Sequence, residues 1–454
     1  MRLTPKTLEL VRGRIERLPL FDASEYAELN PDVPAPLDPA QHYVDHGIWE
    51  KRPIATSPRI ARLLASVPVG TAPQQPWDHD VAAVLSNIYK LDVGVFASSR
   101  GNFFMREIAE HVVRDLASLG VRARVLDEMS PHGERPDVCI FVAPHEFFLL
   151  GKGREWSREE IRSTAFMLST EQVHTPWFLE SLPYLLPARG IIDGNAQTLD
   201  FFRTAGVPTL FYFPGFSATQ GADGAPPNHA LARGLTNEAL SYRATSDDPW
   251  LARPIDIMFT GASSPVRDDF FGRHAGDLAD LTSFVYLVRP FRLPLSLAED
   301  EPRPALNRFV ARRSKIVLNL HQNEIGYFEW HRMVIQGMWQ GALVISDPCL
   351  PHPIFKPGIH YLEDIPRRIP KLVRWLIGTE RGRRTAERIR GEALAALAEH
   401  AASRKMALRL SKFLLHSTPG SDDVPHQSAN GPRFEPGTFN NKRLGGSGDQ
   451  PLQL

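Results

Sequence analysis

The sequence predicts an α/β protein with two domains that face each other across a cleft, each a parallel sheet wrapped by helices. Short apolar strands alternate with amphipathic helices in two separate stretches, a repeat typical of parallel sheets. A segment rich in Gly, Pro, Asn and Ala separates the two stretches at residues 218–254. The 454 residues also exceed the roughly 150 that one domain usually holds. A small helical module precedes the two domains, and a disordered tail follows them.

Composition is that of an ordinary globular protein. Hydrophobic residues make up 43% of the chain and charged residues 23%, and the formal net charge is zero. A neutral chain has no overall field that attracts nucleic acid, so no nucleic-acid partner is expected. We expect a cytoplasmic protein, because the chain starts without a signal-peptide core and no apolar run approaches about 18 residues. Arginines crowded between residues 367 and 390 would suit peripheral contact with the inner membrane surface.

Residues 1–54 are predicted to form the helical module. Residues 7–18 have the apolar periodicity of a helix. Asp22 is placed to cap a second helix, and Asp38, followed by Pro39, to cap a third. Residues 55–77, rich in Pro, Ala and Gln, are predicted to be a linker to the first domain.

The first domain is predicted to span residues 78–217. Its longest helix is expected over residues 103–119, and Gly120 is expected to end it. Six strands are expected, at residues 93–97, 121–126, 137–142, 164–168, 190–193 and 209–213.

The second domain is predicted to span residues 255–414. Its strands are expected at residues 255–259, 284–288, 316–321 and 342–346, followed by helices near 366–413. Residues 415–454 are rich in Ser, Gly, Pro and Asn and lack periodicity, so this tail is expected to be disordered.

Polar side chains gather where the strands of the second domain end. His321 ends the third predicted strand, and Glu324, Glu329, His331 and Arg332 lie between it and the fourth. Ligands of open parallel sheets bind at this edge. Imidazole, carboxylate and guanidinium groups together suit a ligand that carries both hydroxyls and phosphate, and a nucleotide sugar is such a ligand.

The turn after the first strand of this domain is a candidate phosphate site. Gly261 is predicted to lie in a turn that opens a helix, whose N–H groups and dipole attract anions. Arg267 follows one to two turns later and could grip a diphosphate through two hydrogen bonds. The alternative is an ordinary turn followed by a surface arginine.

The run from Ile316 to Tyr361 resembles the C-terminal half of bacterial GT-B glycosyltransferases. The shared pattern is a strand, a helix that contains an arginine, the segment Gly341-Ala-Leu-Val-Ile-Ser-Asp347, and Phe-x-Pro-Gly. The N-terminal module, with Asn30-Pro-Asp-Val33 and His42-Tyr-Val-Asp-His-Gly47, is similar to one appended to many bacterial polysaccharide glycosyltransferases. The resemblance implies two Rossmann-like domains facing a cleft and a glycosyltransferase that uses a nucleotide-sugar donor.

The resemblance also implies which residues bind. It gives a donor-binding set of Gly261, Arg267, His321, Glu329 and Arg332. It gives an acceptor-side loop of Arg100, Gly101 and Asn102, although Asn102 could simply cap the next helix. Many relatives carry two glutamates eight positions apart, and this chain departs from them with Phe328, beside Glu329, and Gln336 at those places.

His145 and Glu171 are the predicted catalytic pair, because each follows a strand at the expected cleft edge. Transfer with inversion needs a base that takes the proton of the acceptor hydroxyl, whereas transfer with retention needs only positioning. The alternatives are a loop histidine with no catalytic part and a glutamate that caps a helix or forms a salt bridge.

The leading hypothesis is transfer of a sugar from a nucleotide-diphosphate sugar to a hydroxyl of a glycan or lipid-linked acceptor, in surface polysaccharide or glycoconjugate synthesis. A sugar-nucleotide epimerase and a non-catalytic glycan- or nucleotide-binding protein are the alternatives. No cofactor besides the co-substrate is expected. The acidic pairs Asp247-Asp248 and Asp268-Asp269 lack the strand-flanked Asp-x-Asp pattern of metal-dependent glycosyltransferases, so no metal is expected.

Overall fold

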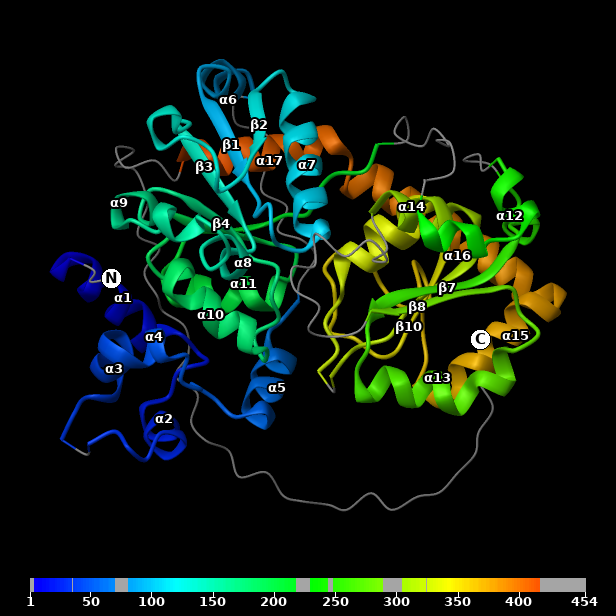
Figure 1. The fold of residues 1–454 in the computed structure, drawn as a ribbon, viewed down its shortest axis with the longest axis horizontal. Helices are drawn as coiled ribbons and strands as arrows, with labels where there is room; N and C mark the ends of the chain where they lie inside the picture. Colours follow the sequence, from blue (N-terminus) through cyan, green and yellow to red (C-terminus); the bar gives the residue numbers. More distant parts are fainter. Residues whose placement is uncertain are drawn as a thin grey trace. The chain divides into compact units, whose positions relative to one another are not determined.

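The computed structural model describes residues 4–34, 36–69, 81–217, 229–243, 248–288, 304–323 and 325–416. They form two parallel sheets, each covered by helices, so the predicted fold class is confirmed (Figure 1). Glu324, much of the predicted connection and the predicted tail from residue 417 onward lie outside the described residues.

The first sheet has six parallel strands in the order β2-β1-β3-β4-β5-β6. They are β1 (Asp92–Phe96), β2 (Arg122–Leu126), β3 (Val138–Val142), β4 (Phe166–Leu168), β5 (Gly190–Asp193) and β6 (Thr209–Phe211). Every residue of β3, β4 and β5 is buried, which is why these strands are continuous apolar runs with no alternation. Ile140 of β3 lies opposite Val95 of β1 and Phe166 of β4, in register on both sides.

Helices connect and cover these strands. They are α6 (Val81–Ile88), α7 (Phe103–Ala117), α8 (Pro144–Phe147), α9 (Glu159–Arg162), α10 (Pro176–Leu185) and α11 (Ala196–Thr204). Asn102 begins α7, because its side chain accepts a hydrogen bond from the Phe104 N–H at 3.0 Å. Gly120 follows the end of α7 with a φ of 80°, a conformation that glycine adopts without strain.

The second sheet has five parallel strands in the order β11-β10-β9-β7-β8. They are β7 (Ile255–Ala262), β8 (Ser283–Val288), β9 (Ser314–Asn319), β10 (Leu343–Ser346) and β11 (Leu362–Glu363). The helices that accompany them are α12 (Asn237–Ser241), α13 (Pro265–Leu278), α14 (Pro304–Arg313), α15 (Ile369–Gly378) and α16 (Glu380–His400).

The N-terminal module consists of α1 (Pro5–Arg17), α2 (Ala23–Leu29), α3 (Pro39–His42), a π-helical turn (Tyr43–Gly47) and α4 (Ile48–Glu50). Asp22 and Asp38 cap α2 and α3. Val11, Ile15 and Tyr26 belong to the same apolar cluster as residues of the first sheet, so the module packs onto that domain.

Two segments differ from their predicted assignments. Helix α5 (Ser57–Ser66) lies inside the predicted linker, where Ile60 and Leu64 supply a buried face. Helix α17 (Ser403–His416), most of which is predicted to belong to the second domain, packs against the first: Phe413 contacts Phe166 of β4. The apolar spacing that predicts a helix does not show which core its buried face joins.

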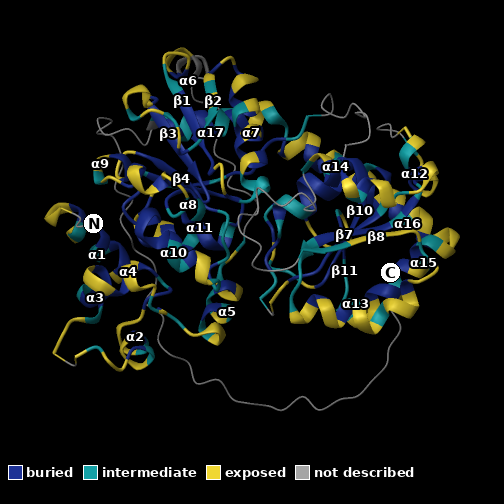
Figure 2. Ribbon diagram, viewed as in Figure 1, coloured by how far each residue is buried: buried dark blue, intermediate teal, exposed yellow. Residues whose placement is uncertain are grey.

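The two sheets share a core. The inner strands of both sheets are largely buried, while the edge strands β2 and β8 and the outer faces of the helices are partly exposed (Figure 2). One apolar cluster runs from Ile108 of α7 to Trp330 and Met333, which precede β10. None of the described helices is long and apolar enough to cross a membrane.

Candidate active site

A cavity of about 440 Å³ lies at the carboxyl ends of both sheets. Its walls come from the start of α7, the loops after β4 and β5, the end of β7 and the segment after β9. Six of the residues predicted as site residues line it: Asn102, Glu171, Gly261, Arg267, Glu329 and Arg332. Four others do not line it: Arg100, Gly101, His145 and His321.

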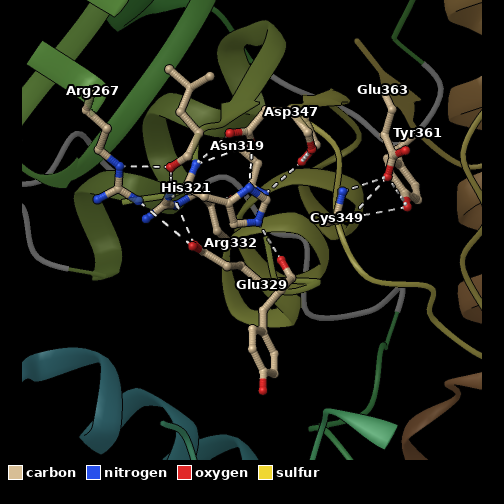
Figure 3. Close-up of polar contacts among 12 residues, drawn as sticks. Arg267, Asn319, His321, Glu329, Arg332, Asp347, Cys349, Tyr361 and Glu363 are labelled. Carbon is tan, nitrogen blue, oxygen red and sulfur yellow. Dashed lines mark hydrogen bonds and ion pairs between the residues drawn. The ribbon is translucent and has the colours of Figure 1, made fainter. Parts of the chain in front are cut away.

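Arg267 and Arg332 meet on one wall of the cavity (Figure 3). The Arg267 guanidinium donates to the carbonyl oxygens of Leu320 and Ala262, at 2.8 and 2.9 Å. Arg332 donates to the Leu320 carbonyl as well, at 3.2 Å. Both guanidinium carbons lie close to the Phe259 ring, 5.4 and 5.3 Å from its centroid. Neutral carbonyls and an aromatic ring thus fix two cations side by side.

Glu329 is a carboxylate that faces both arginines. Its oxygens lie 3.3 Å from Arg332 and 3.9 Å from Arg267. Burial alone would raise the pKa of Glu329, but the positive charges of Arg332, His321 and Arg267 lower it below its ordinary value. Two guanidinium groups against one carboxylate leave this wall with an excess of positive charge, which suits a diphosphate.

Gly261 lies within β7, so the predicted turn that opens a helix at this residue is wrong. The strand continues to Ala262, and α13 begins at Pro265 after Ser264 accepts a hydrogen bond from the Arg267 N–H. A Cβ at Gly261 would lie 3.1 Å from Arg267 Nη1 and 3.2 Å from Arg332 Nη2. Because glycine has no Cβ, both guanidinium groups can pack against the backbone at this position.

The helix that carries Arg332 is not a regular α-helix. It is a π-helical turn, η8 (His331–Gly337), followed by a 3₁₀ turn (Met338–Gln340) that ends at Gly341. Such wide turns are frequent at functional sites. Here the turn places both Arg332 and Gln336 on the cavity wall.

His321, predicted to touch the donor, lies beneath the cavity wall. Its Nδ1 is 2.5 Å from Asp347 Oδ1 and its Nε2 is 2.6 Å from the Tyr327 carbonyl oxygen. Burial alone would lower the pKa of His321, but Asp347, Glu329 and the Tyr327 carbonyl raise it above its ordinary value. Both ring nitrogens thus face oxygen atoms, and the imidazole connects Asp347 to the loop that leads to Glu329.

His145 and Glu171 lie together on the opposite wall. His145 Nε2 is 3.3 Å from Glu171 Oε1, and His145 is buried while Glu171 lines the cavity. The Ser181 hydroxyl donates to the Trp177 carbonyl at 3.0 Å, so at 3.4 Å from His145 Nδ1 it can only accept. The proton of the neutral ring is therefore on Nδ1, and the Nε2 lone pair faces Glu171.

The protonation of Glu171 follows from this pairing. Burial, with a smaller contribution from the negative charge of Glu146, raises the pKa of Glu171 to about 8. Burial lowers the pKa of His145 to about 3. A protonated Glu171 that donates to the neutral His145 satisfies both side chains, so the resting site holds one proton between them near neutral pH.

Asp193 adds a second carboxyl group to this wall. It ends β5 and is fully buried, and its Oδ1 accepts a hydrogen bond from the Asn195 N–H at 2.8 Å. Burial raises the pKa of Asp193 to about 7. Since Asn195 lines the cavity, Asp193 supports the wall from behind.

The predicted acceptor-side loop lies mostly outside the cavity. Asn102 both caps α7 and lines the cavity, and its N–H donates to Glu146 Oε2 at 2.8 Å. A Cβ at Gly101 would clash with the same Glu146 carboxylate, which explains the glycine. Arg100 is exposed and Gly101 is buried, and neither reaches the cavity, because the loop folds back onto Glu146.

No protein-family model matches the sequence, and no curated protein matches it. Among solved structures, the chain is similar to Anabaena Alr3699/HepE in complex with UDP and glucose, with 10% identity and a TM-score of 0.46 over 72% of this chain and 100% of that one. It is also similar to T4 phage BGT in complex with UDP and Mn²⁺, with 12% identity and a TM-score of 0.43 over 71% and 99%. A third similar structure is S. aureus TarM, with 10% identity and a TM-score of 0.35 over 61% and 54%.

These likenesses are distant, so we take the function from the cavity itself. Within the described residues, no cluster of three or more His, Cys, Asp or Glu side chains is arranged to hold a metal ion.

Glu107 is a site residue that sequence reasoning missed. It is buried on α7, and its carboxylate accepts from Arg308 Nη1 and from His331 Nε2, the latter at 3.0 Å. His331 lines the cavity. A signal was present, because Glu107, His111 and Asp115 recur every four residues beside the apolar face of α7, where three buried polar groups need partners.

Proposed function

We propose that this protein is a glycosyltransferase that moves a sugar from a nucleotide-diphosphate sugar to a hydroxyl group. The observation that carries the proposal is a single cavity with two unlike walls. Arg267 and Arg332 stand on one wall with a partly neutralised charge, and Glu171 stands on the other with a raised pKa. A reaction in which a diphosphate leaves while a hydroxyl loses its proton needs both walls.

In the proposed step, the acceptor oxygen forms a bond to the anomeric carbon of the sugar. The bond between that carbon and the diphosphate oxygen breaks, and its electron pair leaves with the diphosphate. The ionised Glu171 takes the hydroxyl proton and, once protonated, can donate to the lone pair of His145 Nε2, 3.3 Å away. Arg267 and Arg332 stabilise the charge that develops on the leaving group. A direct displacement of this kind inverts the anomeric configuration.

The proposed acceptor is a glycan or lipid-linked hydroxyl used in surface polysaccharide or glycoconjugate synthesis, on the cytoplasmic side of the membrane. The support is the sequence resemblance of the N-terminal module and the donor segment to such enzymes. The module packs against the first domain through Val11, Ile15 and Tyr26.

A thermal-shift screen against nucleoside diphosphates and their sugars tests the donor site. A ligand at one hundred times its dissociation constant stabilises by about 2.7 kcal/mol, a shift that is easily measured. We expect one base to give a selective shift that Arg332→Ala abolishes. Arg374→Ala is the matched control, because Arg374 is exposed and pairs with Asp280 on the surface. The absence of a shift with every nucleotide would overturn the proposal.

Product analysis then separates the alternatives. Transfer to an added acceptor, or slow hydrolysis of the donor without one, supports the transferase. An epimerised nucleotide sugar would favour an epimerase. Selective binding with neither product would favour a non-catalytic binding protein.

A further inference from the structure

Glu107 belongs to the first domain, but its carboxylate accepts hydrogen bonds from side chains of the second domain. It lies on α7, while Arg308 lies on α14 and His331 begins η8. The carboxylate accepts from Arg308 Nη1 and lies 3.0 Å from His331 Nε2. A third group, His111 Nε2, lies 3.8 Å away. Because Glu107 is buried beside an arginine, it is held as an anion that orients whatever donates to it.

This contact fixes the tautomer of His331. The ring must donate Nε2–H to the carboxylate, so a neutral ring keeps Nδ1 without a proton. Burial and the positive charge of Arg332 lower the pKa of His331 to about 3, so the ring is neutral. Phe104 packs edge-on against the ring, with 4.9 Å between centroids. Nδ1 has no hydrogen-bond partner within the described residues, and His331 lines the cavity.

We propose that His331 presents Nδ1 to the cavity as an acceptor for a substrate hydroxyl, and that Glu107 is the residue that positions it. The inference rests on the proposed function, which supplies two sources of a hydroxyl: the sugar of the donor and the acceptor molecule. A carboxylate behind an imidazole, with the other ring nitrogen facing a reacting group, is the arrangement that sets both tautomer and direction.

The competing explanation is a latch that only joins the two domains. In that case the Glu107–Arg308 ion pair holds the two domains together, and Nδ1 of His331 has no function. The two explanations predict different results when the two nitrogens are replaced one at a time.

Two substitutions achieve this replacement. In His331→Gln the side-chain amide reaches the place of Nε2, so it can still donate to Glu107 but leaves the cavity without its acceptor. In His331→Asn the amide oxygen reaches the place of Nδ1, so the cavity acceptor remains but the bond to Glu107 is lost. We expect His331→Gln to keep the melting temperature and lose about tenfold in kcat/KM, the effect of one hydrogen bond. We expect His331→Asn to have a lower melting temperature than the wild type, and to retain more activity per folded molecule than His331→Gln. The reverse order would overturn the proposal.

The source of the hydroxyl follows from which constant changes in His331→Gln. A rise in KM for the nucleotide sugar, together with slower donor hydrolysis without acceptor, identifies a hydroxyl of the sugar. An unchanged hydrolysis rate with a raised KM for the acceptor identifies the acceptor hydroxyl. No change in any of these constants would contradict a role of Nδ1.

A measurement without substrate keeps this inference separate from the proposed function. Nitrogen-15 spectra of the histidine-labelled full chain, assigned by comparison with His331→Gln, report the tautomer of His331 directly. We expect Nε2–H with unprotonated Nδ1 near neutral pH, and a change in this signal in Glu107→Gln. A doubly protonated ring or the Nδ1–H tautomer would contradict the proposed role of Nδ1, even if the protein proves to be a glycosyltransferase. A failed nucleotide screen with the expected tautomer would instead remove only the function on which it rests.

Discussion

The two walls of the cavity are built from the same kind of strand-to-helix junction but differ in the charge that their buried groups keep. On the wall of the second sheet, buried Arg267 and its neighbour Arg332 remain cations, with Glu329 ionised between them. On the wall of the first sheet, burial makes Glu171 and Asp193 retain protons. The guanidinium group cannot shed its charge at these pH values, whereas a carboxyl group can. One wall is therefore suited to bind an anion and the other to move a proton.

The largest expected effect comes from removing the proton-accepting group. Glu171→Gln should lower kcat by about a hundredfold or more, because a positioned base contributes about 10²–10⁴. Binding of the nucleotide, measured by calorimetry, should be unchanged, since the opposite wall is intact. Glu160→Gln, on the exposed face of α9, is the control. If Glu171→Gln lost nucleotide binding and turnover to the same extent, the assignment of binding to one wall and proton transfer to the other would be wrong.

The pH profile of the wild-type protein tests the same group. The ionised form of Glu171 is the base, and its pKa is about 8. Turnover should therefore rise as pH passes upward through about 8 and level off above it. The residual activity of Glu171→Gln should be flat across this range. A wild-type profile that falls over the same interval would show that the protonated form is the active one.

On the binding wall, Arg332→Lys separates charge from geometry. Lysine keeps the positive charge but lacks the planar fork that binds two phosphate oxygens. We expect the dissociation constant for the nucleoside diphosphate to rise about tenfold, the effect of one charge-assisted hydrogen bond. Calorimetric titration of the wild type, Arg332→Lys and Arg332→Ala should rank affinity in that order. Lysine binding as well as arginine would show that only charge matters.

The sequence predicts these walls unequally. The apolar runs before Glu171 and Gly261 locate the strand ends, so the two sheets follow from periodicity, and six of the residues predicted at those ends line the cavity. The direction of a side chain after a strand does not follow. His321 turns under the wall because Asp347, 26 residues later, meets it there, and Glu107 matters only because α14 lies beside α7. Such pairings depend on tertiary packing, which spacing along the chain does not encode.

Asp193→Asn tests the other half of the comparison, the storage of a proton by a buried carboxyl group. The pKa of Asp193 is about 7 in the folded protein, against an ordinary value of 3.8. Between these values the folded protein keeps a proton that the unfolded chain has lost, so the free energy of unfolding falls as pH rises from about 4 to about 7. Asparagine has no proton to lose, so its free energy of unfolding should not fall over this pH range. The variant should be more stable than wild type by up to roughly 4 kcal/mol at pH 8, and the two proteins should be equally stable near pH 4. Urea unfolding at both pH values measures this, with Asp200→Asn, at a half-buried position on α11, as control. A stability difference between variant and wild type that is the same at both pH values would refute the shifted pKa.

The last prediction concerns the place where the walls meet. Gly194 follows β5 on the proton-moving wall, and a Cβ there would overlap the indole ring of Trp330, which precedes Arg332 on the binding wall. Gly194→Ala should cost about 1–3 kcal/mol in unfolding free energy, because Trp330 is buried and cannot move without disturbing its neighbours. Gly272→Ala is the matched control: it lies in α13, where an added methyl group would have no atom within 4 Å, so it should gain about 0.5–1 kcal/mol. If both variants change stability alike, the close contact between Gly194 and Trp330 does not hold the two walls at their observed separation.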